Sequence, residues 1–234
     1  MDRFFFIVFC IWSFVLLGRP QDIFPLLQHI PLAKIGAGIL LFFFIFNSSS
    51  FTYLSAPQLR YYIALIIIMI IGIPFSFYPR LSFEIVFFQY SIVIFFSFIF
   101  YRIIDSEKRL STLLLIGCLG NGLYTLAALL SKGIQSSSRL SFSGMFDPND
   151  LAYFTLVFLP LNLIFMSRDN PAWVRLACLG FFFSGTTVIA LSGSRGGMLA
   201  FCIVIAMLLF FKSKTIKLSI KILFIGICAL LILN

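Results

Sequence analysis

The stretch FFFSGTTVIALSGSRGGMLAFCIVIAMLLFF, residues 181–211, decides the fold class of this protein. Two apolar runs flank the polar connection SGSRGG, residues 192–197. A helix that crosses a bilayer needs about 20 mostly apolar residues, and each run supplies most of that length. The pattern predicts two membrane helices that are joined by a short, glycine-rich reversal.

The rest of the chain has the same character. Of its 234 residues, 61% are hydrophobic and only 11% are charged, and the mean hydropathy is +1.10. These values exclude a water-soluble domain. We expect an all-α, polytopic transmembrane helical bundle, in which residues 1–234 form a single integral membrane domain with short loops. Polar interruptions predict about nine spans, at 4–18, 31–46, 61–77, 83–101, 110–130, 150–167, 173–191, 197–211 and 217–234.

The net charge of +9 has a topological explanation. The basic residues are scattered through the connections and build no basic aromatic face, which argues against nucleic acid as a partner. Most of them fall at the N-terminus and in every second connection after it, which all lie on the same side of the membrane. The positive-inside rule therefore predicts a cytoplasmic N-terminus and places the connections at 131–150 and 192–197 on the outer side.

The glycines, the cysteines and the single histidine indicate how the helices pack and whether the bundle binds a metal. Gly117, Gly120 and Gly122 in the fifth predicted span would let a neighbouring helix approach closely. The five cysteines all fall in predicted spans without a Cys-x-x-Cys pair, so we interpret them as packing residues. His29 is the only histidine and has no partner for a metal site or a triad. We therefore expect no bound metal.

The connection SKGIQSSSRLSFSGMFDPND, residues 131–150, is the longest polar one. Its end predicts a helix start: Asp147 is the N-cap, Pro148 takes the first helical position, and Asp150 resembles the second acid of a capping box. Capping does not account for Arg139 or Asn149. Both residues suit contact with a polar head group at the outer membrane surface.

The connection SGSRGG offers a binding site for an anion. Ser194 is a candidate cap for the following helix, Gly196 and Gly197 leave the backbone accessible, and Arg195 adds a permanent charge with a planar fork of donors. Charge-assisted hydrogen bonds contribute about 1.5–3 kcal/mol each, so two or three arginines suffice to hold a diphosphate. From spacing alone, a helical hairpin whose arginine extends to lipid head groups is an equal alternative. The Gly-Lys-Ser/Thr ending of an ATP-binding loop is absent.

RPQDIFP (19–25), RLSFSGMFDPNDLA (139–152) and SGSRGG (192–197) occur in this order along the chain. In sequence and order these motifs resemble the bacterial O-antigen ligase and O-antigen polymerase family. The resemblance implies an inner-membrane glycosyltransferase that moves a glycan from an undecaprenyl-diphosphate donor to lipid A core or another acceptor. It implies no metal and no nucleotide cofactor. Membrane lipids are the remaining expected partners.

Residue roles follow from the matching motifs. The resemblance implies that Arg139, Arg195 and Asn149 bind the donor diphosphate on the periplasmic side, with Arg80 at another outward turn as a weaker candidate. Ser194, Gly196, Gly197, Asp147, Pro148 and Asp150 would support that site structurally. In the family, a large outer loop and further spans follow, and that loop carries the histidine that activates the acceptor. We expect this chain, which ends at Asn234 in its ninth apolar segment, to be the N-terminal portion of a longer domain of this type.

Other functions fit the same bundle. A polymerase would extend the glycan instead of ligating it, and a truncated remnant would hold donor without transferring it. A transporter of lipid-linked glycan is a further alternative. Transporters place ionisable groups near the membrane midplane and contain internal repeats. Here the charges lie in the connections, which favours an enzyme.

Overall fold

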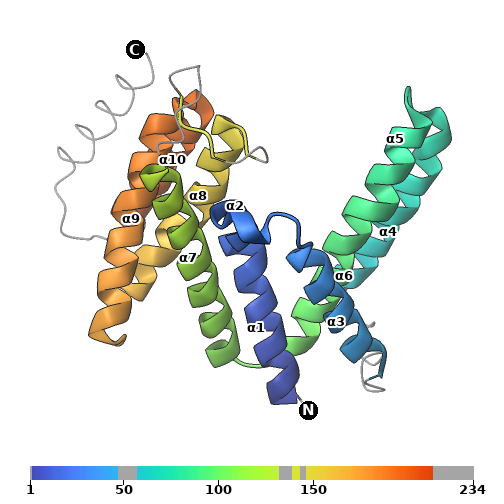
Figure 1. Cartoon of the computed structure of the whole chain (residues 1–234), viewed down its shortest axis with the longest axis horizontal. Coiled ribbons are helices and arrows are strands. Elements are labelled where there is room, and N and C mark those ends of the chain that lie inside the picture. Colours follow the sequence, from blue (N-terminus) through green and yellow to red (C-terminus); the bar gives the residue numbers. More distant parts are fainter. Residues whose placement is uncertain (1, 47–56, 132–138, 143–145, 213–234) are drawn as a thin grey trace. The chain divides into compact units, whose positions relative to one another are not determined.

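The structure, a computed structural model, describes residues 2–46, 57–131, 139–142 and 146–212. Within these ranges all regular secondary structure is helical, apart from one isolated bridge between Phe142 and Phe146, which confirms the predicted all-α class. The chain packs as two compact units (Figure 1). Unit 1 comprises the described residues of 1–10 and 33–112, and unit 2 comprises those of 11–32 and 113–234.

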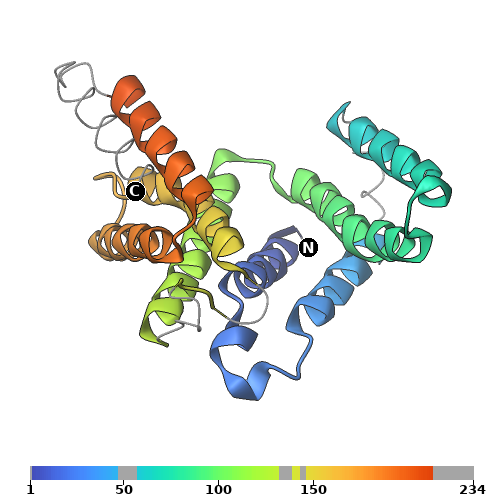
Figure 2. The same ribbon diagram turned by 90° about the horizontal axis from the view of Figure 1, so that it is seen from above.

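Unit 1 is built around a helical hairpin. Helix α4 (Pro57–Gly72) ends in the short 3-10 helix η3 (Ile73–Phe75). The chain then returns through α5 (Pro79–Glu84), a π-helical segment η4 (Ile85–Tyr90) and α6 (Ser91–Ile103). Helix α4 packs on η4 and α6 (Figure 2). Helix α3 (Leu32–Phe46) meets α6 through an edge-to-face contact between Phe44 and Phe95.

Two helices begin in unit 1 and continue in unit 2: α1 (Asp2–Gly18), from residue 11 onward, and α7 (Glu107–Leu130), from residue 113 onward. In unit 2, α1 leads into the short helices α2 (Pro20–Ile23) and η1 (Pro25–Leu27). Helix α8 (Pro148–Phe165) packs on both α9 (Ala172–Ser192) and α10 (Arg195–Lys212). Its core joins α7, α8 and α9 through Cys118, Phe158, Phe165, Val174 and Cys178. Cys118, Cys178 and Cys202 in unit 2, like Cys10 in unit 1, are buried and form no disulfide among the described residues, as predicted for packing residues. Cys228 lies outside the described residues.

Three glycines of α7 each admit a different neighbour. A Cβ on Gly120 would lie 3.0 Å from the backbone nitrogen of Gly18 in α1. A Cβ on Gly117 would meet the ring of Phe158 at 2.6 Å, and one on Gly122 would meet the ring of Phe181 at 2.1 Å. The predicted close approach is therefore confirmed. It involves three helices, because successive small residues point to different sides of α7.

The predicted number of nine spans needs correction. Five helices of the described chain are long and apolar enough to cross a membrane: 3–23, 79–103, 107–130, 148–165 and 172–192. The predicted spans at 31–46, 61–77 and 197–211 coincide with apolar helices of 10–17 residues, which are short of the required length of about 20 residues. The predicted span at 217–234 lies outside the described residues. The apolar helices indicate a multi-pass membrane protein.

Candidate functional site

The second and third motifs of the sequence meet at one end of unit 2, where α8 and α10 begin (Figure 1). Arg139 connects them. Its Nε donates to the carbonyl oxygen of Ser192 at 2.8 Å, and a terminal nitrogen donates to Oδ1 of Asn149 at 3.0 Å. The backbone N–H of Leu140 also donates to the carbonyl of Leu191 at 2.9 Å. Arg139 thus fastens the connection to both the start of α8 and the end of α9.

Gly193 is required beside this arginine for two reasons. Its φ of 59° lies in the left-handed region, which ends α9 in the way that glycine favours. A Cβ at this position would also lie 3.3 Å from Nε of Arg139. A side chain at 193 would therefore strain the backbone and crowd the arginine. The carbonyl groups of Leu191 and Ser192 have no partner within α9, and the negative end of the helix dipole favours a cation there, which Arg139 supplies.

Both predicted caps are present. Oδ1 of Asp147 accepts from the backbone N–H groups of Asn149 and Asp150 at 2.7 and 2.8 Å, with Pro148 at the first helical position. Oγ of Ser194 accepts from the backbone N–H of Gly197 at 3.1 Å. Ser194 is only 1% exposed, so its hydroxyl supports α10 and does not face a ligand.

Gly196 and Gly197 allow α8 and α10 to approach each other at their first turns. A Cβ on Gly197 would meet Cβ of Ala152 at 2.7 Å, and one on Gly196 would meet the hydroxyl oxygen of Tyr153 at 2.3 Å. The predicted accessible backbone is found at Gly196, which is exposed, but not at Gly197, which is buried. Both glycines also leave room for residues of α8.

Arg195 lies between the capping residue Ser194 and the two glycines, and it is exposed. Among the described residues its guanidinium has no ion pair and no hydrogen-bond partner. Asn149 is also exposed, and it uses Oδ1 for Arg139. Arg139 retains donors on its terminal nitrogens beyond the one that bonds Asn149. The end of unit 2 therefore presents one uncommitted guanidinium and one that is partly committed.

The first motif joins the cluster through contacts that the sequence analysis missed. Arg19 forms an ion pair with Asp22, and its guanidinium lies 5.4 Å from the ring centre of Phe146. The hydroxyl of Tyr124 lies 3.4 Å from Oδ2 of Asp22 and donates to the carbonyl of Phe142 at 3.2 Å. An arginine and an aspartate three residues apart are the only local signal of this arrangement. The aromatic contacts join segments that are far apart in sequence.

Two acidic residues, Asp147 and Asp150, stand at the start of α8. The carboxylate of Asp147 is already engaged by two backbone N–H groups. In the described contacts Asp150 does not return the reciprocal bond of a capping box. Its side chain is exposed at the start of α8. We call the end of unit 2 where α8 and α10 begin its rim. An anion bound at this rim would be held by directed hydrogen-bond donors and not by a large excess of positive charge.

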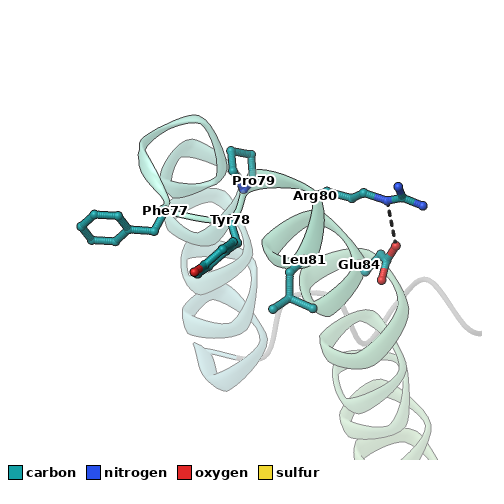
Figure 3. A pocket seen from close by; sticks show the side chains of 6 residues that line it. All are labelled: Phe77, Tyr78, Pro79, Arg80, Leu81 and Glu84. Carbon is teal, nitrogen blue, oxygen red and sulfur yellow. Dashed lines mark ion pairs between the residues drawn. The ribbon is translucent and has the colours of Figure 1, made fainter.

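Arg80 lies in unit 1, and the structure does not bring it together with the other predicted residues. Its side chain is 95% exposed and pairs with Glu84 at 3.6 Å. Both residues line a hollow of about 520 Å³ beside the start of α5, and Figure 3 shows their side chains with the ion pair between them. The hollow is lined by Phe77, Tyr78, Pro79, Arg80, Leu81 and Glu84.

Comparisons with protein-family models, with curated proteins and with solved structures found no match to this chain.

Proposed function

We propose that this chain is a membrane glycosyltransferase of O-antigen ligase type. It transfers a glycan from an undecaprenyl-diphosphate donor to lipid A core or another acceptor hydroxyl, on the periplasmic face of the bacterial inner membrane. One observation carries the proposal. Arg139, Asn149 and the turn that bears Arg195 lie in one cluster of unit 2, although they come from separate motifs of the sequence.

The cluster suits a diphosphate that arrives on a lipid. The donor's polyprenyl chain would remain in the bilayer beside the apolar helices, and its diphosphate would lie at their ends. Arg195 offers a guanidinium that has no described partner, and a guanidinium fork matches the spacing of phosphate oxygens. Arg139 keeps further donors while it fixes the connection to Ser192 and Asn149.

The proposed reaction is an inverting displacement. The acceptor hydroxyl attacks the anomeric carbon of the donor glycan, its proton passes to a general base, and the bond from that carbon to the diphosphate oxygen breaks. Negative charge then develops on the departing diphosphate. Arg195, with support from Arg139, stabilises that charge, which is the contribution that fixed hydrogen-bond donors make to a transition state. Binding of the diphosphate by Arg80, which lies outside this cluster, stays a prediction.

The test replaces Arg195 with alanine. In cells whose own copy of the gene is deleted, wild-type protein should restore transfer of the glycan to its acceptor, and Arg195→Ala should abolish transfer while the protein still accumulates in the membrane. Loss of one donor to a transition-state oxyanion typically lowers a rate by about 10²- to 10³-fold. Glycan transfer is read on gels of the extracted acceptor.

Arg168→Ala is the matched control. Arg168 is also exposed, but it lies in the connection that follows the opposite end of α8, so the control should retain transfer. Normal transfer by Arg195→Ala would refute the proposal. Proteoliposomes that accumulate lipid-linked glycan without any transferred product would instead support the transporter.

A further inference from the structure

We propose that Tyr153 is a further donor-binding residue, whose hydroxyl hydrogen-bonds a phosphoryl oxygen of the polyprenyl diphosphate next to Arg195. This inference rests on the proposed function and deepens it. No sequence motif singled out Tyr153, because a tyrosine near the start of a membrane helix is a common interfacial residue.

The position of the hydroxyl supports the proposal. Tyr153 follows Asn149 by four residues on α8, so both side chains lie on the same side of that helix. A Cβ built on Gly196 would lie 2.3 Å from the hydroxyl oxygen, which places that oxygen against the backbone of the residue after Arg195. The tyrosine hydroxyl therefore lies beside the turn that carries the uncommitted guanidinium.

The hydroxyl is also available to a ligand. Tyr153 is 48% exposed, and within the described residues its hydroxyl has no hydrogen-bond partner. Tyr124 provides a contrast in the same unit, since it is fully buried and its hydroxyl donates to Phe142. The phenol of Tyr153 therefore lies at the rim, and no described residue of the protein hydrogen-bonds its hydroxyl. A phenol O–H next to an arginine is a suitable donor to a phosphoryl oxygen.

Glycine at 196 makes this placement sterically allowed. The only other atom of Tyr153 within 4 Å of the hypothetical Cβ is Cζ, at 3.4 Å, which is ordinary van der Waals contact. The conflict at 196 therefore arises from the hydroxyl oxygen alone. Gly196→Ala should displace that oxygen in the wild type and should have little steric effect when residue 153 is phenylalanine.

The experiment measures binding of undecaprenyl diphosphate to the full chain in phosphatidylcholine nanodiscs, without any glycan. We expect Tyr153→Phe to weaken binding about tenfold, the typical effect of removing one hydrogen bond to a charged group. Gly196→Ala should also weaken binding. The double variant should bind no more weakly than Tyr153→Phe alone, because both changes act on the same hydroxyl.

Tyr61→Phe is the matched control, since Tyr61 is 78% exposed on α4 in unit 1 and should leave binding unchanged. A tyrosine that only anchors α8 in the interface would lose little on replacement by phenylalanine, because the ring remains. If wild type binds and Arg195→Ala weakens binding while Tyr153→Phe does not, the inference is wrong and the proposed function stands. If wild type does not bind the diphosphate, the proposed function fails and the inference fails with it.

Discussion

Individual side chains at the rim of unit 2 differ in how far the protein already uses them. Arg139 bonds Ser192 and Asn149, Ser194 is buried as a cap, and Arg195 is exposed without a described partner. The two arginines looked equivalent in the sequence. Their surroundings separate them into one that chiefly holds the connection in place and one that is free to contact a ligand.

Arg139→Lys tests this division at the level of a single residue. A lysine ammonium cannot reproduce the planar fork that reaches both the Ser192 carbonyl and the Asn149 amide. We expect the variant to lose about 1–3 kcal/mol of stability, as is typical when buried or partly buried acceptors lose their partner. Thermal unfolding of the purified chain measures this, with Arg168→Lys as the control. Unchanged unfolding with reduced donor binding would show that Arg139 acts only as a ligand.

Pairs of helices owe their close contacts to glycine. Gly18 meets Gly120 between α1 and α7, and Gly197 meets Ala152 between α10 and α8. In a membrane, helices gain little from hydrophobic association, so close backbone approach and dispersion contacts provide much of the packing energy. Substitution at such glycines should therefore act on helix packing before it acts on chemistry.

A double-mutant cycle between Gly196 and Tyr153 measures this effect of a glycine on helix packing. Gly196→Ala should lower the stability of the wild type only slightly, because the crowded Tyr153 hydroxyl is the far end of a 48% exposed side chain and can move aside. In a Tyr153→Phe background the same change should be neutral or slightly stabilising, because alanine is the better helix former by roughly 1 kcal/mol. Chemical denaturation in detergent gives both values. Equal destabilisation in the two backgrounds would contradict the geometry at this contact.

Sequence patterns located the helices better than the contacts between them. Predicted spans such as 110–130 and 173–191 differ from α7 and α9 by a few residues, and the caps at Asp147 and Ser194 follow from local rules. The predicted span 31–46 matches α3 within one residue, whereas the predicted span 61–77 runs past the end of α4 at Gly72, because apolar residues continue through η3. The contacts of Arg19 with Phe146 and of Tyr153 with Gly196 join distant segments, so no local pattern encodes them.

The whole molecule presents large apolar side chains on its helices, such as Ile68 at 66% and Val157 at 63% exposure. Exposed apolar surface of this kind belongs against lipid. In unit 2, the starts of α8 and α10 share one end, and the connection with Arg168 follows the other end of α8. This arrangement predicts that Arg139 and Arg195 lie on one side of the membrane and Arg168 on the other.

Accessibility labelling tests that topology. Single cysteines at 139, 195 and 168 are introduced into a chain whose native cysteines are changed to serine or alanine. In intact cells, a thiol reagent that cannot cross the inner membrane should label positions 139 and 195 but not 168 until the membrane is opened. Labelling of 139 and 195 from opposite sides, or of both only after opening, would exclude a periplasmic donor site.

The bond between Arg139 and Ser192 joins groups that are 53 residues apart in the chain. During translation at about 5–20 residues per second, the connection that carries Arg139 leaves the ribosome roughly 3–10 seconds before its acceptor does. Asp147 can start α8 at once, since its cap is local. The rim is therefore completed only after the turn that follows α9 has been released by the translocon.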